Sequence, residues 1–330
     1  MRVLFVAMRW DYKERGRGDS FEYTNFWESL RRHPRVEARM FPFDEKESEL
    51  GREGMNAALL EEVHEYSPEL VFFFMFTDEF DPKIVRRISD QTVTVNWFAD
   101  DQWRFDTYSR HWAPHLTWVA TTDPEAAEGY RRLGFSNVIR TQWGCNHYLY
   151  RPLRTGRDIQ VSFVGQPHGT RRATIDAIRE AGVEARAWGY GWEDGRLSQT
   201  EMIEAFSRSC INLNLSNASR DQGLRRIAGL FLKRKGPLVV PRMGEIRRNL
   251  QEFRAKGRDQ IKGRNFEIPG CRTFMLTSHV EGLDEYFVPG KEMVTFAGTD
   301  DLIAKIGKYL ESVDEREAIA EAAYERTLAE

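Results

Sequence analysis

Leu70–Phe76 (LVFFFMF) is an unbroken apolar run with the length of one β-strand. A strand that is apolar on both faces is typical of a parallel sheet covered by helices on both sides. Similar runs occur at Val3–Met8 and Ile159–Val164, and amphipathic, helix-like stretches separate them. This alternation predicts an α/β fold.

The first half of the chain contains the elements of one such domain. Around the run at 70–76, we expect strands at 3–8, 36–41, 92–98, 117–120 and 137–141, with helices at 21–32, 55–66 and 82–89. The pattern restarts after Pro152. There we expect strands at 159–164, 183–188, 211–215, 237–240, 273–276 and 293–296, with helices at 171–181, 201–209, 301–311 and 315–328.

Two βα series in succession predict two Rossmann-like, doubly wound domains that face a cleft. We place the first domain at 1–153 and the second at 154–330. The length of 330 residues agrees with about two domains.

The composition is that of a soluble globular protein, with 41% hydrophobic and 30% charged residues. A net charge of −3 supplies no basic field, so we expect no nucleic-acid partner.

The three cysteines, Cys145, Cys210 and Cys271, have neither zinc-knuckle nor disulfide-framework spacing, which favours a reducing compartment. The N-terminal apolar run is too short for a signal peptide, and no run approaches the ~18 residues of a membrane span. We therefore expect a cytoplasmic protein.

The stretch Gln260–Phe296 combines cations with a carboxylate. Lys262 and Arg264 come just before Glu267, at the expected start of a helix. Cationic side chains suit phosphates, and a carboxylate accepts hydrogen bonds from ribose hydroxyls. The group therefore suits a nucleoside diphosphate, and a surface helix of mixed charge is the alternative.

The loop after the first strand contains Gly16 and Gly18, and Asp19 or Ser20 is placed to cap the next helix. A glycine loop at the start of a helix can approach a phosphate closely. The spacing is not GxGxxG, so no dinucleotide fingerprint is present. An ordinary capped loop is the alternative.

A second loop of this kind begins at Gly165, directly after a strand of the second half. Open α/β sheets bind ligands at the carboxyl ends of their strands. Gly165 would let the backbone come near a ligand, and Arg171 or Arg172 would reach a phosphate. His168 is interpreted as a solvated loop histidine.

Asn96–Phe105 (NWFADDQWRF) ends a strand of the first half with two aspartates flanked by tryptophans. One of them, Asp100 or Asp101, would act as a general base for an acceptor hydroxyl. Alternatively, one aspartate caps a helix and the other pairs with Arg104. The two are adjacent and not spaced as a DxD motif, and no His/Cys cluster exists, so we expect no metal.

The segment 220–264 is markedly basic. We interpret it as a solvated insertion. The alternative is a patch that makes peripheral contact with an anionic or lipid-bearing acceptor at a membrane surface.

The sequence 262–296, followed by the helix at 301–311, resembles the C-terminal signature of the CgeB-like glycosyltransferases. These are named for spore maturation protein CgeB and belong to the group-1 glycosyltransferases of GT-B fold. The segments IQVSFVGQ, ARAWGYGW and INLNLS precede it in the same order, and NWFADDQWRF in the first half is also similar. The resemblance implies a GT-B architecture whose second domain holds a nucleotide sugar.

The resemblance also implies roles for individual residues. Glu267 has the position of the carboxylate that contacts the donor ribose, and Lys262 and Arg264 match the basic positions before it, with Asn265 beside them. Gly165 lies in the loop that faces the diphosphate. The segment 188–192 (WGYGW), which includes Gly189 and Tyr190, falls where the nucleotide base region is often lined. Apart from the resemblance, Gly18 remains a candidate binding residue because its glycine loop can approach a phosphate.

Two departures from the family pattern bear on these roles. Arg272 stands where group-1 enzymes usually carry glycine, so the turn there is expected to differ. Asp259 replaces the upstream glutamate of retaining members, which leaves the stereochemical outcome open.

We therefore expect a metal-independent glycosyltransferase that uses a nucleoside diphosphate sugar, with UDP as the expected carrier and no further cofactor. Asp100 is the first choice for activating the acceptor, with Asp19 or Asp101 behind it. The acceptor would be a sugar, a lipid-linked molecule or a protein. A nucleotide-sugar epimerase of the same fold and a non-catalytic sugar-nucleotide-binding protein are the alternatives.

Overall fold

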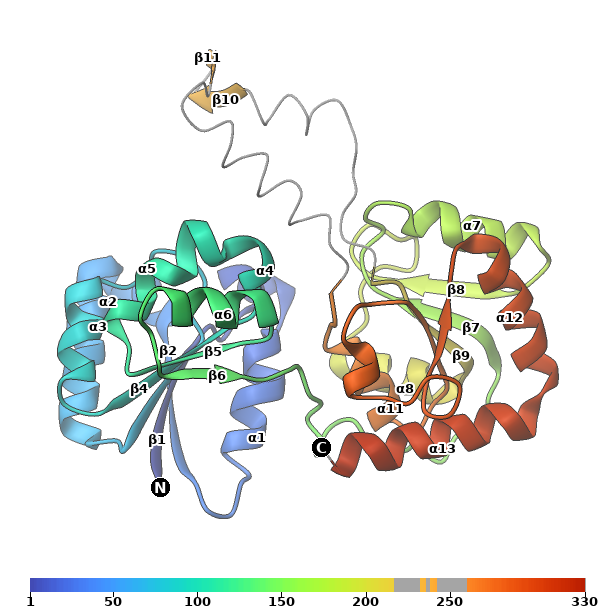
Figure 1. Cartoon of the computed structure of the whole chain (residues 1–330), viewed down its shortest axis with the longest axis horizontal. Helices are drawn as coiled ribbons and strands as arrows, with labels where there is room; N and C mark the ends of the chain where they lie inside the picture. The colour runs from blue at the N-terminus through green and yellow to red at the C-terminus, as the bar shows by residue number, and fades with distance from the viewer. Residues whose placement is uncertain (217–231, 236–237, 242–259, 330) are drawn as a thin grey trace. The chain divides into compact units, whose positions relative to one another are not determined.

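The computed structural model describes residues 1–216, 232–235, 238–241 and 260–329 (Figure 1). The chain forms two compact units, Met1–Gln142 and Trp143–Glu330. Each unit has its own parallel sheet with helices packed against it, as the apolar strands of the sequence predicted. Residues 143–153, which we had assigned to the first domain, belong to the second unit by this division.

The first unit is built on a six-stranded sheet in which every pairing is parallel. Its strands are β1 (Arg2–Ala7), β2 (Glu37–Pro42), β3 (Leu70–Phe73), β4 (Val93–Phe98), β5 (Trp118–Thr121) and β6 (Val138–Arg140). Their order in the sheet is β2-β1-β3-β4-β5-β6.

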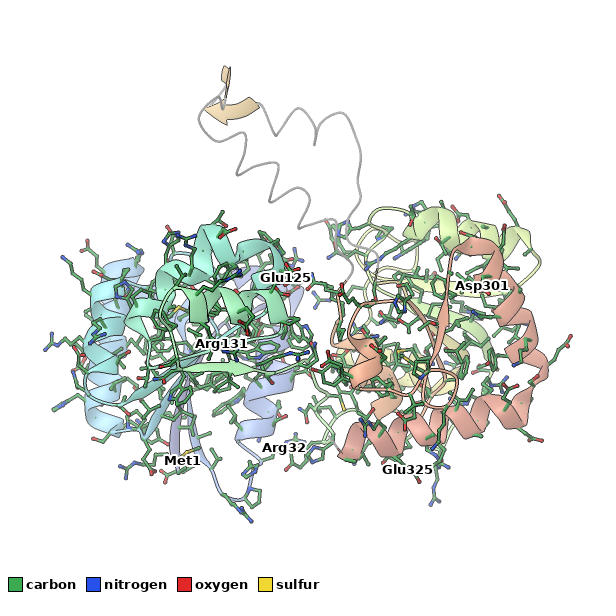
Figure 2. All side chains as sticks on the ribbon, in the orientation of Figure 1. Met1, Arg32, Glu125, Arg131, Asp301 and Glu325 are labelled. Atoms are coloured by element: carbon green, nitrogen blue, oxygen red, sulfur yellow. The ribbon has the colours of Figure 1, made fainter. Side chains whose placement is uncertain are left out.

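Helices cover this sheet. They comprise a π-helical stretch (Glu22–Trp27) that runs into α1 (Glu28–Leu30), then α2 (Phe43–Tyr66), α3 (Pro82–Ser89), α4 (Asp101–Arg104), α5 (Arg110–Trp112) and α6 (Pro124–Arg132). Asp81 and Asp123 cap α3 and α6 through their carboxylates, and each is followed by a proline in the first turn. On α6, Glu125 and Arg131 are exposed (Figure 2), whereas Tyr130 is fully buried in the core.

The second unit has a five-stranded parallel sheet among its described residues. Its strands are β7 (Ile159–Val164), β8 (Ala185–Trp188), β9 (Ser209–Asn214), β12 (Met275–Ser278) and β13 (Val294–Phe296). The order is β13-β12-β9-β7-β8. Two further strands, β10 (Leu232–Lys235) and β11 (Leu238–Pro241), form a separate antiparallel pair.

The helices of the second unit are α7 (Arg171–Glu180), α8 (Gln199–Arg208), α11 (Arg264–Gly270), α12 (Thr299–Glu311) and α13 (Val313–Ala329). Ser198 and Glu201 form a capping box at the start of α8. Among the described residues, no helix has both the length and the apolar character that crossing a bilayer requires.

Both sheets have the same topology. In each, the second strand pairs on one side of the first strand and the third strand pairs on its other side. The winding direction therefore reverses between β1 and β3 in the first unit and between β7 and β9 in the second. Doubly wound sheets bind their ligands outside the carboxyl ends of the strands at such a reversal.

The expected strands and helices are all present; β3 and α2 differ in extent, and α6 is an additional helix. β3 ends at Phe73: the amide of Phe74 still bonds the carbonyl of Val6 in β1, but that of Met75 bonds the side chain of Asn96. α2 begins twelve residues before the expected start at 55, since helical turns precede a break at Gly51, where φ is 71°. α6 was not expected, although Asp123 followed by proline is a helix-start signal.

Candidate functional site

The carboxyl ends of β7 and β9 are tied together by Arg171, the first residue of α7. Its Nη1 donates to the carbonyl of Gln166, 3.0 Å away, in the loop after β7. Its Nη2 donates to the carbonyl of Leu215, 2.7 Å away, just beyond β9. The guanidinium that the sequence suggested for a phosphate thus braces the winding reversal of the second sheet.

Arg172, the other arginine suggested for a phosphate, also contacts the protein. Its Nη2 donates to the carbonyl of Gly191 over 2.6 Å, and its guanidinium lies 4.7 Å from the ring centroid of Trp192. It therefore supports the loop after β8 rather than extending freely into solvent.

The loops after β7 and β8 lie in backbone contact through two of the predicted glycines. Gly189 has a φ of 143°, and a Cβ atom there would lie 2.4 Å from the carbonyl oxygen of Gly165. The amide of Gly165 donates to the carbonyl of Trp188 over 2.8 Å, and the indole of Trp192 donates to the carbonyl of Gly165 over 2.7 Å. Gly189 permits this close approach, whereas a Cβ atom at Gly165 would lie 2.8 Å from the ring of Phe163. Tyr190 beside Gly189 is 76% exposed.

Polar contacts place the start of α11 at the carboxyl ends of β9 and β12. The side-chain amide of Asn265 donates to the hydroxyl of Thr277 in β12, and that hydroxyl donates to the carbonyl of Asn214 at the end of β9. Asn265 is fully buried, and its Oδ1 accepts a 2.9 Å hydrogen bond from the amide of Lys262. It thereby fixes the turn that carries Lys262.

Glu267 lies one turn into α11 with only 1% of its surface exposed. Its Oε2 accepts from Nη1 of Arg264, and its Oε1 accepts a 2.8 Å hydrogen bond from the hydroxyl of Tyr150. Burial lowers the pKa of Arg264, and the positive charge of the exposed Arg196 acts in the same direction, while Lys262 is half-buried.

Arg264 and Glu267 thus contact one another in α11, next to the turn that carries Lys262, at the carboxyl ends of β9 and β12. Tyr150 and Arg196 are the members that sequence reasoning missed. Tyr150 comes from the segment that precedes β7, and nothing in its local sequence marks it as the partner of a carboxylate 117 positions away.

In the first unit, Asp19 forms an ion pair with Arg9, with 2.6 Å between Oδ1 and Nη1. The following helix is capped by Ser20, whose Oγ accepts from the amide of Tyr23 and donates to the carbonyl of Met8. Of the two capping candidates, Ser20 is therefore the cap. Gly18 has a φ of 82° and its carbonyl accepts from the amide of Asp11, so its conformation closes the loop after β1.

The two neighbouring aspartates after β4 have different surroundings. Asp100 occupies the cap position of α4 through its carbonyl, and its side chain is partly exposed. Asp101 is 1% exposed, accepts a 3.0 Å hydrogen bond from the hydroxyl of Tyr130, and has its pKa raised to about 7 by burial. Asp101 is therefore a core residue, and Asp100 is the one within reach of solvent. Arg104 lies over the ring of Tyr108, 3.9 Å from its centroid.

The π-helical stretch that follows the loop after β1 begins with Glu22, a carboxylate that the sequence did not single out. Burial raises the pKa of Glu22 to about 7, and the charges of Asp11 and Asp44 act in the same direction. Asp44 itself accepts hydrogen bonds from the backbone amides of Arg9 and Trp10. Carboxylates from the loop after β1 and from the start of α2 are thus gathered at the edge of the sheet where its winding reverses.

Two predicted features fall outside the described residues. Asp259, the upstream position of the family motif, is one. The other is most of the basic segment 220–264, of which only the strands β10 and β11 and residues 260–264 are described.

Known proteins resemble this chain in part of its sequence and in its fold. Residues 170–330 match the family described as Glycosyl transferase-like. Sucrose-phosphate synthase from Thermosynechococcus elongatus has a similar structure, with a TM-score of 0.63 and 10% identity, covering 100% of this chain and 94% of that one. The chain has a GT-B fold.

Two other solved structures have a similar fold. HepE from Anabaena, solved in complex with UDP, has a TM-score of 0.57 and 12% identity, with 100% of this chain and 95% of that chain covered. A putative UDP-N-acetylglucosamine 2-epimerase from Listeria monocytogenes has a TM-score of 0.53 and 9% identity, with 98% and 91% covered. At these identities the likeness concerns the fold alone. No curated protein matched the chain in sequence.

Proposed function

We propose that the protein transfers a sugar from a nucleoside diphosphate sugar, with UDP as the carrier, to an acceptor. The observation that carries the proposal is the group Lys262, Arg264 and Glu267 at the carboxyl edge of the second sheet. The match of residues 170–330 to a glycosyltransferase-like family supports it, as do the complexes of HepE, which has the same fold, with UDP and UDP-glucose.

In this proposal Glu267 accepts hydrogen bonds from the ribose hydroxyls of the donor. Lys262 and the Arg264 guanidinium offset the charge that builds up on the leaving diphosphate, so that the reaction proceeds without a metal ion. The turn at Gly165 and the loop at Gly189 and Tyr190 would lie next to the diphosphate and the base. Their mutual backbone contact gives this part of the site a fixed shape.

For the acceptor, we propose Asp100 as the general base, because it lies at the carboxyl end of β4 and its side chain reaches solvent. Asp19 is the second candidate, although its carboxylate already forms an ion pair with Arg9. If transfer retains the configuration of the sugar, the leaving phosphate takes the proton and neither aspartate is required as a base.

Calorimetric titration with UDP, GDP and ADP tests the donor. We expect UDP to bind and Glu267→Gln to weaken its binding about tenfold or more, the effect of losing a charged hydrogen bond. If none of the three nucleotides binds, the proposed function is wrong. Glu267→Gln keeps the shape of the side chain, so a loss of affinity would not reflect a cavity.

Asp100→Asn tests the acceptor side. It should abolish transfer and leave the Kd for UDP unchanged, because Asp100 belongs to the other unit. Normal turnover by this variant would mean that Asp100 acts only as the cap residue of α4. Donor hydrolysis in the absence of acceptor would already separate an enzyme from a protein that only binds the nucleotide sugar.

An epimerase is the second candidate, because the putative epimerase from Listeria monocytogenes shares this fold over most of both chains. Epimerisation needs no acceptor. Incubation with the donor alone, followed by product analysis, distinguishes the two: a changed sugar that is still attached to UDP would favour the epimerase.

A further inference from the structure

Tyr150 links the segment that precedes the second sheet to the carboxylate of α11. Its hydroxyl donates a 2.8 Å hydrogen bond to Oε1 of Glu267, and both side chains are 1% exposed. Arg264 contacts the other carboxylate oxygen, Oε2. The two oxygens of Glu267 are therefore held by two different parts of the second unit.

The backbone around Tyr150 is fixed by a turn. The amides of Leu149 and Tyr150 both donate to the carbonyl of Asn146 over 2.9 Å, and the side chain of Asn146 accepts from the amide of Tyr148. Further along, Arg157 donates to the carbonyls of Ser207 and Ser209, which anchors the segment a second time. The hydroxyl of Tyr150 is therefore presented by an anchored stretch of chain.

The end of α11 approaches this turn at Gly270. A Cβ atom at Gly270 would lie 2.8 Å from Sγ of Cys145 and 3.3 Å from Cβ of Tyr150. Tyr150 also belongs to the buried cluster that contains Phe206 and Phe266. The tyrosine ring is thus packed on one side by α11, and its hydroxyl has a defined direction.

An ionised carboxylate has about four lone-pair directions, so one bond to each oxygen leaves acceptor capacity on both. Fixing the two oxygens from either side restricts rotation of the carboxylate about its last bond. A ligand hydroxyl that binds such a group meets an acceptor that is already oriented, and less conformational freedom is lost on binding.

We propose that Tyr150 is a positioning residue that holds the Glu267 carboxylate in the orientation in which it accepts hydrogen bonds from the donor ribose. The inference rests on the proposed function, because it takes Glu267 as the ribose acceptor. It adds the segment 143–153 to the donor site. It also gives the buried hydroxyl of Tyr150 a role beyond core packing.

The test compares UDP with 2′,3′-dideoxy-UDP, which lacks both ribose hydroxyls. The wild-type protein should prefer UDP by about tenfold or more, and Tyr150→Phe should reduce this preference by about threefold or more, the range for one lost hydrogen bond. Both Kd values are measured by calorimetry. Loss of packing would weaken both ligands equally, so the ratio reports the orientation of Glu267 alone.

Tyr309→Phe is the matched control. Tyr309 is also buried in the second unit, and its hydroxyl lies 3.5 Å from a carboxylate oxygen of Glu315 on α13. This variant should keep the wild-type preference. In a Glu267→Gln background, Tyr150→Phe should change the preference no further, because the carboxylate that it orients is gone.

The outcomes separate the two proposals. If the wild-type protein prefers UDP and Tyr150→Phe retains that preference in full, the positioning role is wrong and the proposed function stands. If the wild-type protein binds neither nucleotide, the proposed function fails and the inference fails with it. If Tyr309→Phe reduced the preference for UDP as much as Tyr150→Phe does, the specific role of Tyr150 would also be wrong.

Discussion

Arg171 reaches from the first turn of α7 to the carbonyl of Leu215, 2.7 Å away, and so closes the gap between the strands at which the second sheet reverses its winding. A basic residue at the start of a helix after a glycine loop is the sequence pattern of a phosphate site. Here the carbonyls of Leu215 and Gln166 already accept hydrogen bonds from this guanidinium, so a phosphate would have to compete with them.

We therefore expect Arg171→Ala to act mainly on stability. Hydrogen bonds to a charged donor are worth about 1.5–3 kcal/mol each, so the unfolding free energy should fall by about 2 kcal/mol or more. The exposed neighbour Arg172 is the control. Its hydrogen bond to the carbonyl of Gly191 and its contact with Trp192 both lie at the surface, where solvent weakens them, so Arg172→Ala should cost about 1 kcal/mol. Urea unfolding of both variants checks this, and equal losses would contradict it.

Alanine substitutions at Gly189 and Gly195 distinguish the cost of a steric clash from the cost of an unfavourable backbone conformation. Both have a positive φ, 143° and 67°, but only at Gly189 would a Cβ atom strike backbone, at 2.4 Å from the carbonyl of Gly165. Nothing lies within 4 Å of the Cβ position at Gly195. Gly189→Ala should therefore destabilise the protein by about 3 kcal/mol or more, and Gly195→Ala by about 1–2 kcal/mol.

Thermal unfolding of the two glycine variants in parallel measures this difference. If Gly195→Ala lowered the unfolding temperature as much as Gly189→Ala, the backbone contact between the loops after β7 and β8 would not be the reason that position 189 requires glycine.

The fold was predictable because it depends on contiguous patterns. Ile159–Val164 is apolar enough to identify a buried strand by itself, and the structure places β7 at the same residues. The order of such strands with helices between them then limits the topology to a parallel sheet.

The partners of individual side chains were less predictable. Asn265 lies between two residues suited to a nucleotide, yet it is fully buried against Thr277. Tyr150 and Glu267 meet across 117 positions. Such contacts depend on how two distant segments pack, and local periodicity does not contain that information. The pair of aspartates after β4 shows the same limit, since Asp100 and Asp101 are neighbours in sequence but only Asp101 enters the core.

Arg272 gives a prediction about an unusual backbone conformation. Its φ is 55°, the left-handed region that glycine adopts at low cost, and the resemblance to group-1 enzymes expects glycine at this position. An arginine there does not by itself demand a different turn. Its side chain contacts Glu321, a pair that is exposed on both sides and contributes about 0–1 kcal/mol.

Arg272→Gly should therefore be more stable than Arg272→Ala by about 1–2 kcal/mol, because both variants lose the ion pair and only alanine keeps the left-handed strain. The comparison of the two variants by chemical denaturation cancels the contribution of Glu321. Equal stabilities would mean that the positive φ is not costly in this turn.

Asp101 predicts how the stability of the first unit depends on pH. Burial raises its pKa from the ordinary value of 3.8 to about 7, while the hydroxyl of Tyr130 donates to it. Between these two values the folded state binds more protons than the unfolded chain. The contribution of Asp101 to the unfolding free energy therefore falls as the pH rises from about 4 to about 7 and is constant above that range.

Asp101→Asn removes this titration and keeps an oxygen that accepts from Tyr130. Relative to the wild-type protein, the variant should gain stability as the pH rises from about 4 to about 7, by up to about 4 kcal/mol at about 1.4 kcal/mol per pKa unit. Glu22, whose pKa burial also raises to about 7, is present in both proteins and cancels in the difference. Urea unfolding at a series of pH values measures the effect, and Asp106→Asn, at an exposed site beside Arg110, should show no such trend. A difference between Asp101→Asn and the wild-type protein that stays constant with pH would mean that Asp101 titrates near its ordinary value and that its burial does not suppress its charge.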